Sequence, residues 1–160
     1  MKVKKLTHTD KSGNPQMVDV SGKAVTKRTA RARAVIEVGS AILKLIKHQE
    51  LVTKKGPVFQ TAILAGTLGA KKTADLIPLA HPLGLEDCTI RISTTRNTIV
   101  IDSTVSVTGK TGVEMEALTA VTVAALTVYD MCKALSHNLV IKEIKLMEKT
   151  GGKKDFKRKS

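Results

Sequence analysis

The sequence predicts an α+β fold in which an antiparallel sheet packs against helices. Residues 88–93 and 98–107 are two β-type stretches separated by the polar residues 94–97, which is the pattern of a β-hairpin. Residues 113–135 form a long helical stretch with no charge in its middle. The expected order of elements is β-α-α-β-β-α-β, which fits an antiparallel sheet packed against helices.

The first third of the chain is expected to supply one strand and one short helix. Residues 30–38 alternate arginines with small or apolar residues and end in a β-branched run, which predicts a strand. Gly39 breaks this pattern. Ser40 is then expected to cap a short helix over residues 41–48.

A second helix is predicted over about residues 58–73, because Pro57 suits the first turn of a helix. Two glycines inside it weaken the helical pattern. They belong to a set of small residues along this helix, namely Ala62, Ala65, Gly66, Gly69 and Ala70. Small side chains let two backbones come close, so we expect this helix to approach another element closely.

The segment that follows, residues 76–83, contains Pro78 and Pro82 and is not expected to form a regular helix. It is apolar enough that we expect it to be buried. His81 lies between Ala80 and Pro82 and is the best acid/base candidate by residue type, because histidine changes its charge near neutral pH. A purely structural histidine at this position is an equal alternative.

The long helix over residues 113–135 is the most informative element. Residues 117–128 carry no charge and are apolar nearly all round, so the helix should be buried on most of its faces. A monomer of 160 residues seldom covers so long a helix on every side. We therefore expect contacts within an oligomer to cover part of it. A last strand is predicted over residues 139–147.

The polar residues of this helix lie at its ends. Glu114 and Glu116 fall in the first turn, and Asp130 and Lys133 lie near the close. A purely structural explanation is available. Acidic residues in the first turn and a lysine in the last turn interact favourably with the helix dipole, and Asp130 with Lys133 is an ordinary ion pair. However, Glu116 and Asp130 lie on one face about 21 Å apart along the axis. Two such helices packed antiparallel about a two-fold axis would bring Asp130 of one copy near Glu116 of the other, forming a site between subunits.

Length and composition indicate a single domain over residues 17–150, with a flexible lead-in over 1–16 and a basic C-terminal tail over 151–160. Hydrophobic residues make up 42% of the chain and aromatic residues only 2%, so the core must be aliphatic. The net charge of +13 favours an anionic partner such as a nucleic acid, a membrane surface or a nucleoside triphosphate. The scarcity of aromatic residues argues against single-stranded nucleic acid, which usually stacks on aromatic side chains.

Other features narrow the class of protein further. There is no signal peptide and no apolar run of about 20 residues, so we expect a cytoplasmic protein without a membrane partner. Cys88 and Cys132 lack the spacing of a disulfide framework or a zinc site. The four histidines lack metal-ligand spacing, and we expect no metal site.

Two glycine-containing loops could meet an anion. Residues 109–112 lead into the N-terminus of the long helix, where backbone N–H groups point outward, although the full phosphate-loop pattern is absent. Residues 149–153 form a second flexible, basic loop. Each signal is weak when taken alone.

Together these segments resemble the MoaC family. The matching runs are residues 17–21 (MVDVS), 55–59 (KGPVF), 71–83 (KKTADLIPLAHPL), 108–120 (TGKTGVEMEALTA), 124–134 (AALTVYDMCKA) and 149–153 (KTGGK). The run at 71–83 corresponds to the family signature K-x-T-x-x-L-I-P-x-x-H-P-L. Many members have Cys where Ala80 stands, so a thiol role at that position is excluded here. Thr150 also stands where Ser is usual.

The resemblance implies a ferredoxin-like fold and a lyase. The expected enzyme is a cyclic pyranopterin monophosphate synthase of molybdenum cofactor biosynthesis, which converts the 3′,8-cyclo-7,8-dihydro form of GTP into cyclic pyranopterin monophosphate and pyrophosphate. It also implies a homohexamer built as a trimer of dimers, with active sites at the dimer interfaces. No cofactor is expected, apart from Mg²⁺ that could accompany the triphosphate.

The resemblance also assigns residues. The implied catalytic positions are Lys55, His81, Glu114, Glu116, Asp130 and Lys133. The implied substrate-binding positions are Leu79, Ala80, His81, Met115, Glu116, Lys149 and Lys153. We expect Asp130 and Lys133 to act as a coupled proton-transfer pair, and Arg31 and Arg33 to attract the triphosphate together with lysines of the tail.

Two alternatives remain open at this point. A basic nucleic-acid-binding module would explain the charge, but the sequence shows no recognisable binding motif of that kind. A structural oligomer would explain the apolar helix as an interface alone. The predicted enzyme has a small-molecule substrate derived from a nucleotide, and we expect it to have no nucleic-acid partner.

Overall fold

The structure, a computed structural model, describes residues 10 and 12–159. Its elements in chain order are β1 (Thr26–Glu37), α1 (Gly39–Leu43), β2 (Val52–Thr53), β3 (Gly56–Pro57), α2 (Val58–Lys71), α3 (Thr73–Leu76), β4 (Asp87–Thr94), β5 (Thr98–Gly109), α4 (Glu114–Cys132), β6 (Val140–Thr150) and β7 (Phe156–Lys157).

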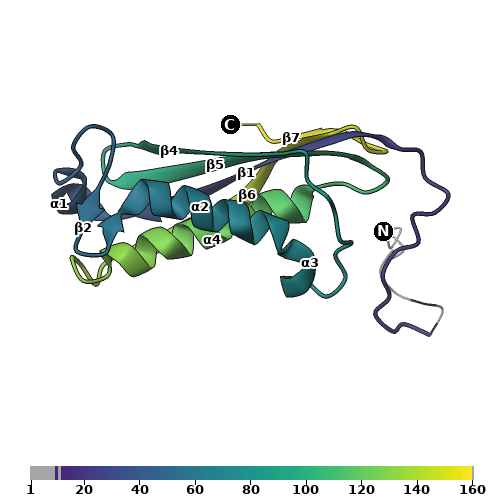
Figure 1. Ribbon diagram of the computed structural model, residues 1–160, viewed down its shortest axis with the longest axis horizontal. Coiled ribbons are helices and arrows are strands. Elements are labelled where there is room, and N and C mark those ends of the chain that lie inside the picture. Colours follow the sequence, from purple (N-terminus) through teal and green to yellow (C-terminus); the bar gives the residue numbers. More distant parts are fainter. Residues whose placement is uncertain (1–9, 11, 160) are drawn as a thin grey trace.

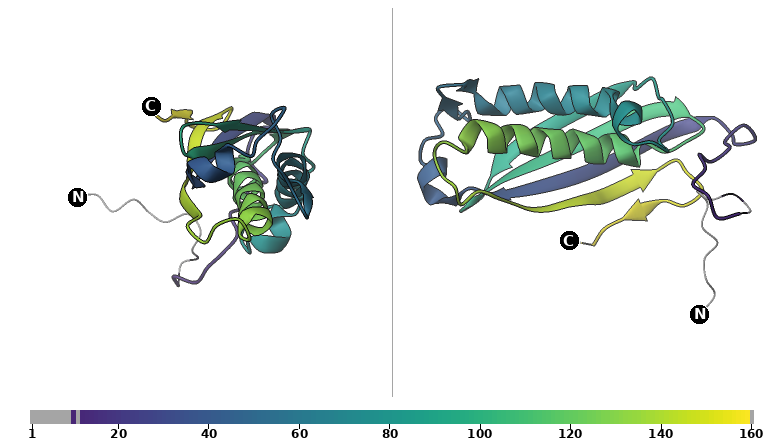
Figure 2. Two further views of the ribbon diagram at one scale, coloured as in Figure 1. Left: turned by 90° about the vertical axis from the view of Figure 1, so that its left-hand side faces the viewer. Right: turned by 90° about the horizontal axis from the view of Figure 1, so that it is seen from below.

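Five strands form one antiparallel sheet in the order β4-β5-β1-β6-β7. The helices α2 and α4 lie side by side along one face of this sheet, which gives the molecule two layers (Figures 1 and 2). The predicted α+β fold is therefore confirmed. The connectivity β1-α2-β4-β5-α4-β6, with β1 and β5 central in the sheet, is the ferredoxin-like arrangement.

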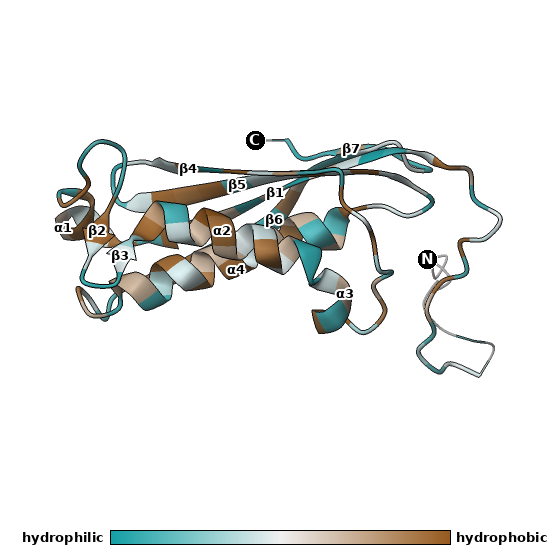
Figure 3. Ribbon diagram, viewed as in Figure 1, coloured by the Kyte–Doolittle hydropathy of each residue, from teal (hydrophilic) through white to brown (hydrophobic). Residues whose placement is uncertain are grey.

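The alternation of β1 separates the two faces of the sheet. Ala32 and Ala34 are fully buried beneath the helices, whereas Arg31 and Arg33 point to the opposite face because successive side chains of a strand alternate. Arg33 makes a two-pronged contact with Asp102 of β5 at 2.8 and 2.9 Å. Hydrophobic colour concentrates on the helices and on the strands behind them (Figure 3). This core is aliphatic, as the composition predicts.

Small residues bring α2 and α4 into close contact, as the sequence predicts. A Cβ added at Gly66 would lie 2.7 Å from the Ala120 carbonyl oxygen of α4 and 2.6 Å from Cδ1 of Ile90. A Cβ added at Gly69 would lie 2.7 Å from Cγ2 of Val123. The two helix backbones can come this close only because these positions have no side chain.

The helix α4 is covered only in part by its own chain. Ala117, Ala124 and Val128 are fully buried, but Leu126 is 55% exposed. By length and composition alone this helix could cross a membrane, yet 56% of the relevant window is buried inside the fold, as in a core helix. One side of α4 therefore remains open to a partner surface.

Two local predictions are wrong. The predicted helix over 41–48 is only α1, which begins at Gly39 and has no side-chain cap from Ser40 or any other residue. It ends at Leu43, and a sharp turn follows at His48 and Gln49, both of which have positive φ. The segment 76–83 is not buried: Leu76 is 58% exposed, and α3 ends just before the first proline.

Part of the described C-terminal segment pairs with the sheet. Phe156 and Lys157 form β7, which pairs with Lys149 and Glu148 of β6. Part of the segment predicted as a tail therefore lies along the sheet edge. Most of the predicted lead-in over 1–16 lies outside the described residues. The division into lead-in, domain and tail stays a prediction.

Candidate active site

The residues that the sequence singles out gather in two groups at opposite ends of α4. The first group surrounds the N-terminus of α4 and lines a pocket of about 590 Å³. The second group, formed by Lys55, Asp130 and Lys133, lies at the C-terminus of α4. At 1.5 Å per residue, the 14 positions between Glu116 and Asp130 place the groups about 21 Å apart. One chain does not unite them.

Eight of the predicted site residues line the pocket at the N-terminus of α4. They are Leu79, Ala80, His81, Glu114, Met115, Glu116, Lys149 and Lys153. They come from the loop after α3, from the first turn of α4, and from the hairpin that joins β6 to β7. Segments that are 70 residues apart in the sequence are thus assembled by the ferredoxin-like connectivity.

The first turn of α4 presents two carboxylates with different surroundings. Glu114 is part-buried, and its carboxylate accepts a 2.7 Å hydrogen bond from Nζ of Lys149. It folds back over Gly112, where an added Cβ would overlap it. Glu116 is only 4% exposed. Burial raises the pKa of the Glu116 carboxyl, and the charge of Glu114 adds to this effect. A carboxyl group of this kind is suited to carry and donate a proton.

His81 has a defined orientation in the pocket wall. Its Nε2 lies 2.9 Å from the carbonyl oxygen of Val18, near the start of the described chain. A carbonyl oxygen only accepts hydrogen bonds, so Nε2 carries the proton. In the neutral ring Nδ1 is then the nitrogen with the free lone pair, so His81 can accept a proton there as a general base.

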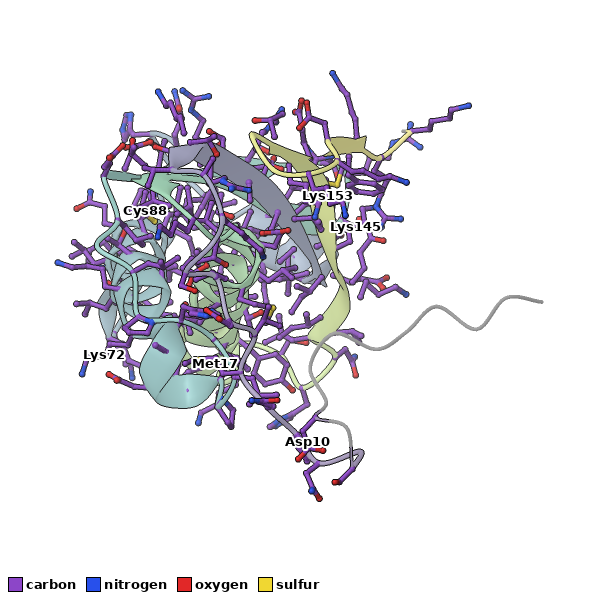
Figure 4. The ribbon with its side chains drawn as sticks, turned by 90° about the vertical axis from the view of Figure 1, so that its right-hand side faces the viewer. Asp10, Met17, Lys72, Cys88, Lys145 and Lys153 are labelled. Carbon is purple, nitrogen blue, oxygen red and sulfur yellow. The ribbon has the colours of Figure 1, made fainter. Side chains whose placement is uncertain are left out.

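The pocket is also strongly basic. Its cationic residues are Lys23, Arg28, Lys110, Lys149, Lys153 and Lys154. Figure 4 looks at this end of the molecule and shows Lys153 at the C-terminal hairpin. The hairpin turn uses Gly151 at φ +81°, where an added Cβ would overlap the carbonyl oxygen of Lys27. Several lysines around one concave surface make a site suited to phosphate groups.

Sequence reasoning found some of these cations and missed others. Lys110 lies in the glycine-containing loop that was predicted to meet an anion, and its Nζ donates to the carbonyl of Ser21 at 2.7 Å. Lys23 and Arg28 had no motif to mark them. Arg31 and Arg33, which were expected to attract the triphosphate, do not line this pocket, because strand alternation turns them to the outer face of the sheet.

The second group is a charged triad at the other end of α4. The Asp130 carboxylate accepts hydrogen bonds from Nζ of Lys55 at 2.6 Å and from Nζ of Lys133 at 2.8 Å. The two lysines, Lys133 foremost, lower the pKa of Asp130 to about 2. The Asp130 carboxylate in turn raises the pKa of the Lys133 ammonium. All three side chains are about half exposed, so solvent and a further ligand can reach them.

Replacing Glu116 by Gln should stabilise the fold at alkaline pH. Burial raises the folded-state pKa of this carboxyl above its ordinary value of 4.5, so its ionisation costs stability, and the full cost is reached once the pH exceeds the folded-state pKa. The penalty develops as the pH rises from 4.5 and is absent below it. We therefore expect a higher Tm for Glu116→Gln at pH 8 and a shrinking difference below pH 4.5, measured by calorimetry. Equal Tm values at pH 8 would contradict the buried, penalised carboxylate.

Within residues 10 and 12–159, no three His, Cys, Asp or Glu side chains are grouped as ligands for a metal ion. The carboxylates of Glu114 and Glu116 are the acidic groups of the pocket. Mg²⁺ typically binds through one or two carboxylates together with substrate phosphates. Glu114 and Glu116 would therefore suit a cation only if a phosphate chain supplied the remaining ligands.

Comparison with known proteins gives matches over most of the chain. The MoaC family matches residues 17–152. The chain is 49% identical to the cyclic pyranopterin monophosphate synthase of Parvibaculum lavamentivorans, over 99% of this chain and 100% of that protein. It is 50% identical to the enzyme of the same name from Desulfitobacterium hafniense, over 92% of this chain and 90% of that protein.

A longer relative matches as well. The Molybdenum cofactor biosynthesis protein 1 of Dictyostelium discoideum is 48% identical over 92% of this chain. The chain spans 26% of the length of that relative. The matched region thus occurs both as nearly a whole protein and as about a quarter of a larger one.

Proposed function

The chain belongs to the MoaC family, and from this premise we propose that it catalyses the reaction of a cyclic pyranopterin monophosphate synthase. The substrate is the 3′,8-cyclo-7,8-dihydro form of GTP, and the products are cyclic pyranopterin monophosphate and pyrophosphate. The enzyme is a lyase in molybdenum cofactor biosynthesis. The observation that carries the proposal is the basic pocket at the N-terminus of α4, which combines several lysines with one histidine and two carboxylates.

The reaction requires cations that stabilise phosphate charge and groups that transfer protons, and the pocket contains residues of both kinds. A sugar hydroxyl gives up its proton to a base such as Nδ1 of His81, and its oxygen attacks the α-phosphorus. The bond from that phosphorus to the bridging oxygen breaks, and pyrophosphate leaves with the electron pair. Cationic side chains stabilise the charge that collects on the phosphate oxygens. Lys149 and Lys153 are suited to this task, and Lys110 and Arg28 extend the basic surface.

Opening the dihydropurine and closing the pyran ring require proton transfers. Nδ1 of His81 can accept a proton, since its Nε2–H is held by Val18. The Glu116 carboxyl, whose pKa is raised by burial, can donate one. Leu79, Ala80 and Met115 line the same pocket and would pack against the pterin rings.

The triad would act as a second proton-transfer set. Asp130 stays ionised to low pH, and it holds the ammonium groups of Lys55 and Lys133 in place. An active site that uses both groups must be assembled from two subunits, because about 21 Å separates them within one chain. We propose a homohexamer, built as a trimer of dimers, in the cytoplasm. The exposed apolar residues Leu64, Leu68 and Leu126 on the helix layer support such a contact.

No cofactor is required by the proposed mechanism. Mg²⁺ could accompany the triphosphate, held by its phosphate oxygens with Glu114 or Glu116. Such an ion would neutralise charge on the leaving pyrophosphate. The residues of the chain would still bind and orient the substrate and move the protons.

The test is turnover of enzymatically prepared cyclo-dihydro-GTP, with both products followed by mass spectrometry. We expect the protein to form cyclic pyranopterin monophosphate and pyrophosphate in equal amounts, and Lys133→Ala to abolish this while keeping its oligomeric state. Lys142→Ala is the matched control, because Lys142 forms an exposed ion pair with Glu37 outside both groups. A folded oligomer without turnover would overturn the proposal. Binding to duplex DNA would then be tested.

A further inference from the structure

Glu50 binds three backbone N–H groups with one carboxylate. Its Oε1 accepts hydrogen bonds from the N–H of Leu51 at 2.7 Å and of Phe59 at 2.8 Å, and its Oε2 accepts one from the N–H of Gln60 at 3.1 Å. Two of these N–H groups belong to the first turn of α2, which has no cap from its own N-cap residue. Glu50 therefore supplies the missing cap from outside the helix.

The three hydrogen bonds of Glu50 reach both ends of the β2–β3 hairpin. Leu51 precedes β2, whereas Phe59 and Gln60 follow β3. The hairpin itself is short, with two paired residues on each strand, one bond from the N–H of Val58 to the carbonyl of Leu51 at 2.8 Å, and two bonds that involve the Thr53 hydroxyl. Leu51 and Val58 are also fully buried in the core, and the Glu50 carboxylate adds polar contacts that join the two ends of the hairpin.

Lys55 lies at the tip of this hairpin. Its Nζ donates to the Asp130 carboxylate at 2.6 Å and to the Asp130 main-chain carbonyl at 3.1 Å. The side chain of Lys55 is half exposed, so packing does little to fix it. The position of its ammonium group depends on where the hairpin holds the Lys55 backbone.

The turn before Glu50 is unusual. Lys47 and Glu50 exchange both backbone hydrogen bonds at 2.9 Å, and the two residues between them have φ of 50° and 60°. This is a two-residue turn of the type that prefers Asn-Gly, yet it is built from His48 and Gln49. Positive φ is uncommon outside glycine, and histidine adopts it more readily than glutamine does, so the cost falls mainly on Gln49. The turn fixes where the Glu50 side chain starts, and the three hydrogen bonds of its carboxylate offset the strain.

We propose that Glu50 is a positioning residue, which clamps the base of the β2–β3 hairpin and thereby holds the Lys55 ammonium against Asp130. The proposal rests on the function proposed above for the triad, but the contact it describes can be measured without turnover. It assigns no contact with the substrate to Glu50.

The test follows the Asp130 carboxyl by NMR titration in Glu50→Gln. In the unaltered protein its pKa is lowered to about 2 by Lys133 and Lys55 together. If Glu50 holds Lys55 in place, Glu50→Gln should raise the pKa of Asp130 toward the value measured in Lys55→Ala. In the Lys55→Ala background, Glu50→Gln should produce no further shift.

The kinetic result should agree with the titration. A displacement of a catalytic group by about 1 Å can cost up to about 100-fold in rate, so we expect a fall of roughly 10- to 100-fold in kcat with little change in KM. Ile101→Val is the matched control, since it removes one methyl group from the core outside both groups. It should lower stability without moving the Asp130 titration.

An unmoved Asp130 titration in folded Glu50→Gln would overturn the proposal. If that variant does not fold, Glu50→Asp keeps the charge but is too short to span both ends of the hairpin, and it should give a partial shift. No shift in folded Glu50→Asp would again count against the clamp. A shift in a protein that shows no turnover would leave the clamp intact and remove only the proposed reaction.

Discussion

Asp130→Asn is expected to lower kcat/KM by at least about 100-fold, the usual contribution of one acid/base group. Asn keeps the shape of the side chain but removes the negative charge that binds the two lysines at 2.6 and 2.8 Å. Without that charge, Lys55 and Lys133 repel each other and lose their fixed positions. The pKa of Lys133, which Asp130 now raises, should fall. Pyrophosphate release in the steady state measures the effect.

The control for this prediction is Asp87→Asn. Asp87 is an exposed aspartate at the start of β4, outside the pocket and the triad. Its replacement should leave kcat/KM within about twofold of the unaltered protein. Asp130→Asn with near-normal turnover would show that the triad is an ordinary surface ion-pair cluster.

Gly66→Val is expected to lower the free energy of unfolding by about 3 kcal/mol, the upper part of the range for overpacking a core. The new side chain would meet the Ala120 carbonyl at 2.7 Å, and this atom belongs to the α4 backbone and cannot rotate away. The helices α2 and α4 must then move apart. Chemical denaturation measures the loss, with Gly66→Ala expected to lie between Val and the unaltered protein.

Gly84→Ala provides the comparison. Nothing lies within 4 Å of a Cβ added at Gly84, and its backbone is not in the left-handed region. The expected change in stability is within about 0.5 kcal/mol. Gly66→Val with unchanged stability would mean that the two helices do not make the contact described here.

Much of the fold could be predicted because each long element has a clear local pattern. The alternation around Arg31 and Arg33 predicted the strand, and the absence of charge in the middle of α4 marked a core helix. The short elements could not be predicted in this way. The helix after Gly39 ends at Leu43 without a glycine or proline to mark its end, and the turn at His48 and Gln49 lacks the residues that such a turn prefers.

Residues of the candidate site could be predicted only where they lie in a recognisable sequence motif. His81 and Glu116 lie in runs that resemble the family signature, and the structure brings both to one pocket. Lys23 and Arg28 reach the same pocket through the tertiary arrangement alone. Glu50 was also missed, because its role depends on backbone N–H groups of residues up to ten positions away. A sequence shows the chemistry of each side chain, but it does not show which side chains share a surface or which backbone N–H groups a carboxylate binds.

The two groups at opposite ends of α4 have a genetic consequence. Under the proposed pairing of subunits, each active site takes its pocket from one copy and its triad from the other. A hybrid of one copy altered at Glu116 and one altered at Asp130 would hold one site with both lesions and one site with neither. Two inactive alleles of this gene would therefore complement each other when expressed together, whereas two alleles altered in the same group would not.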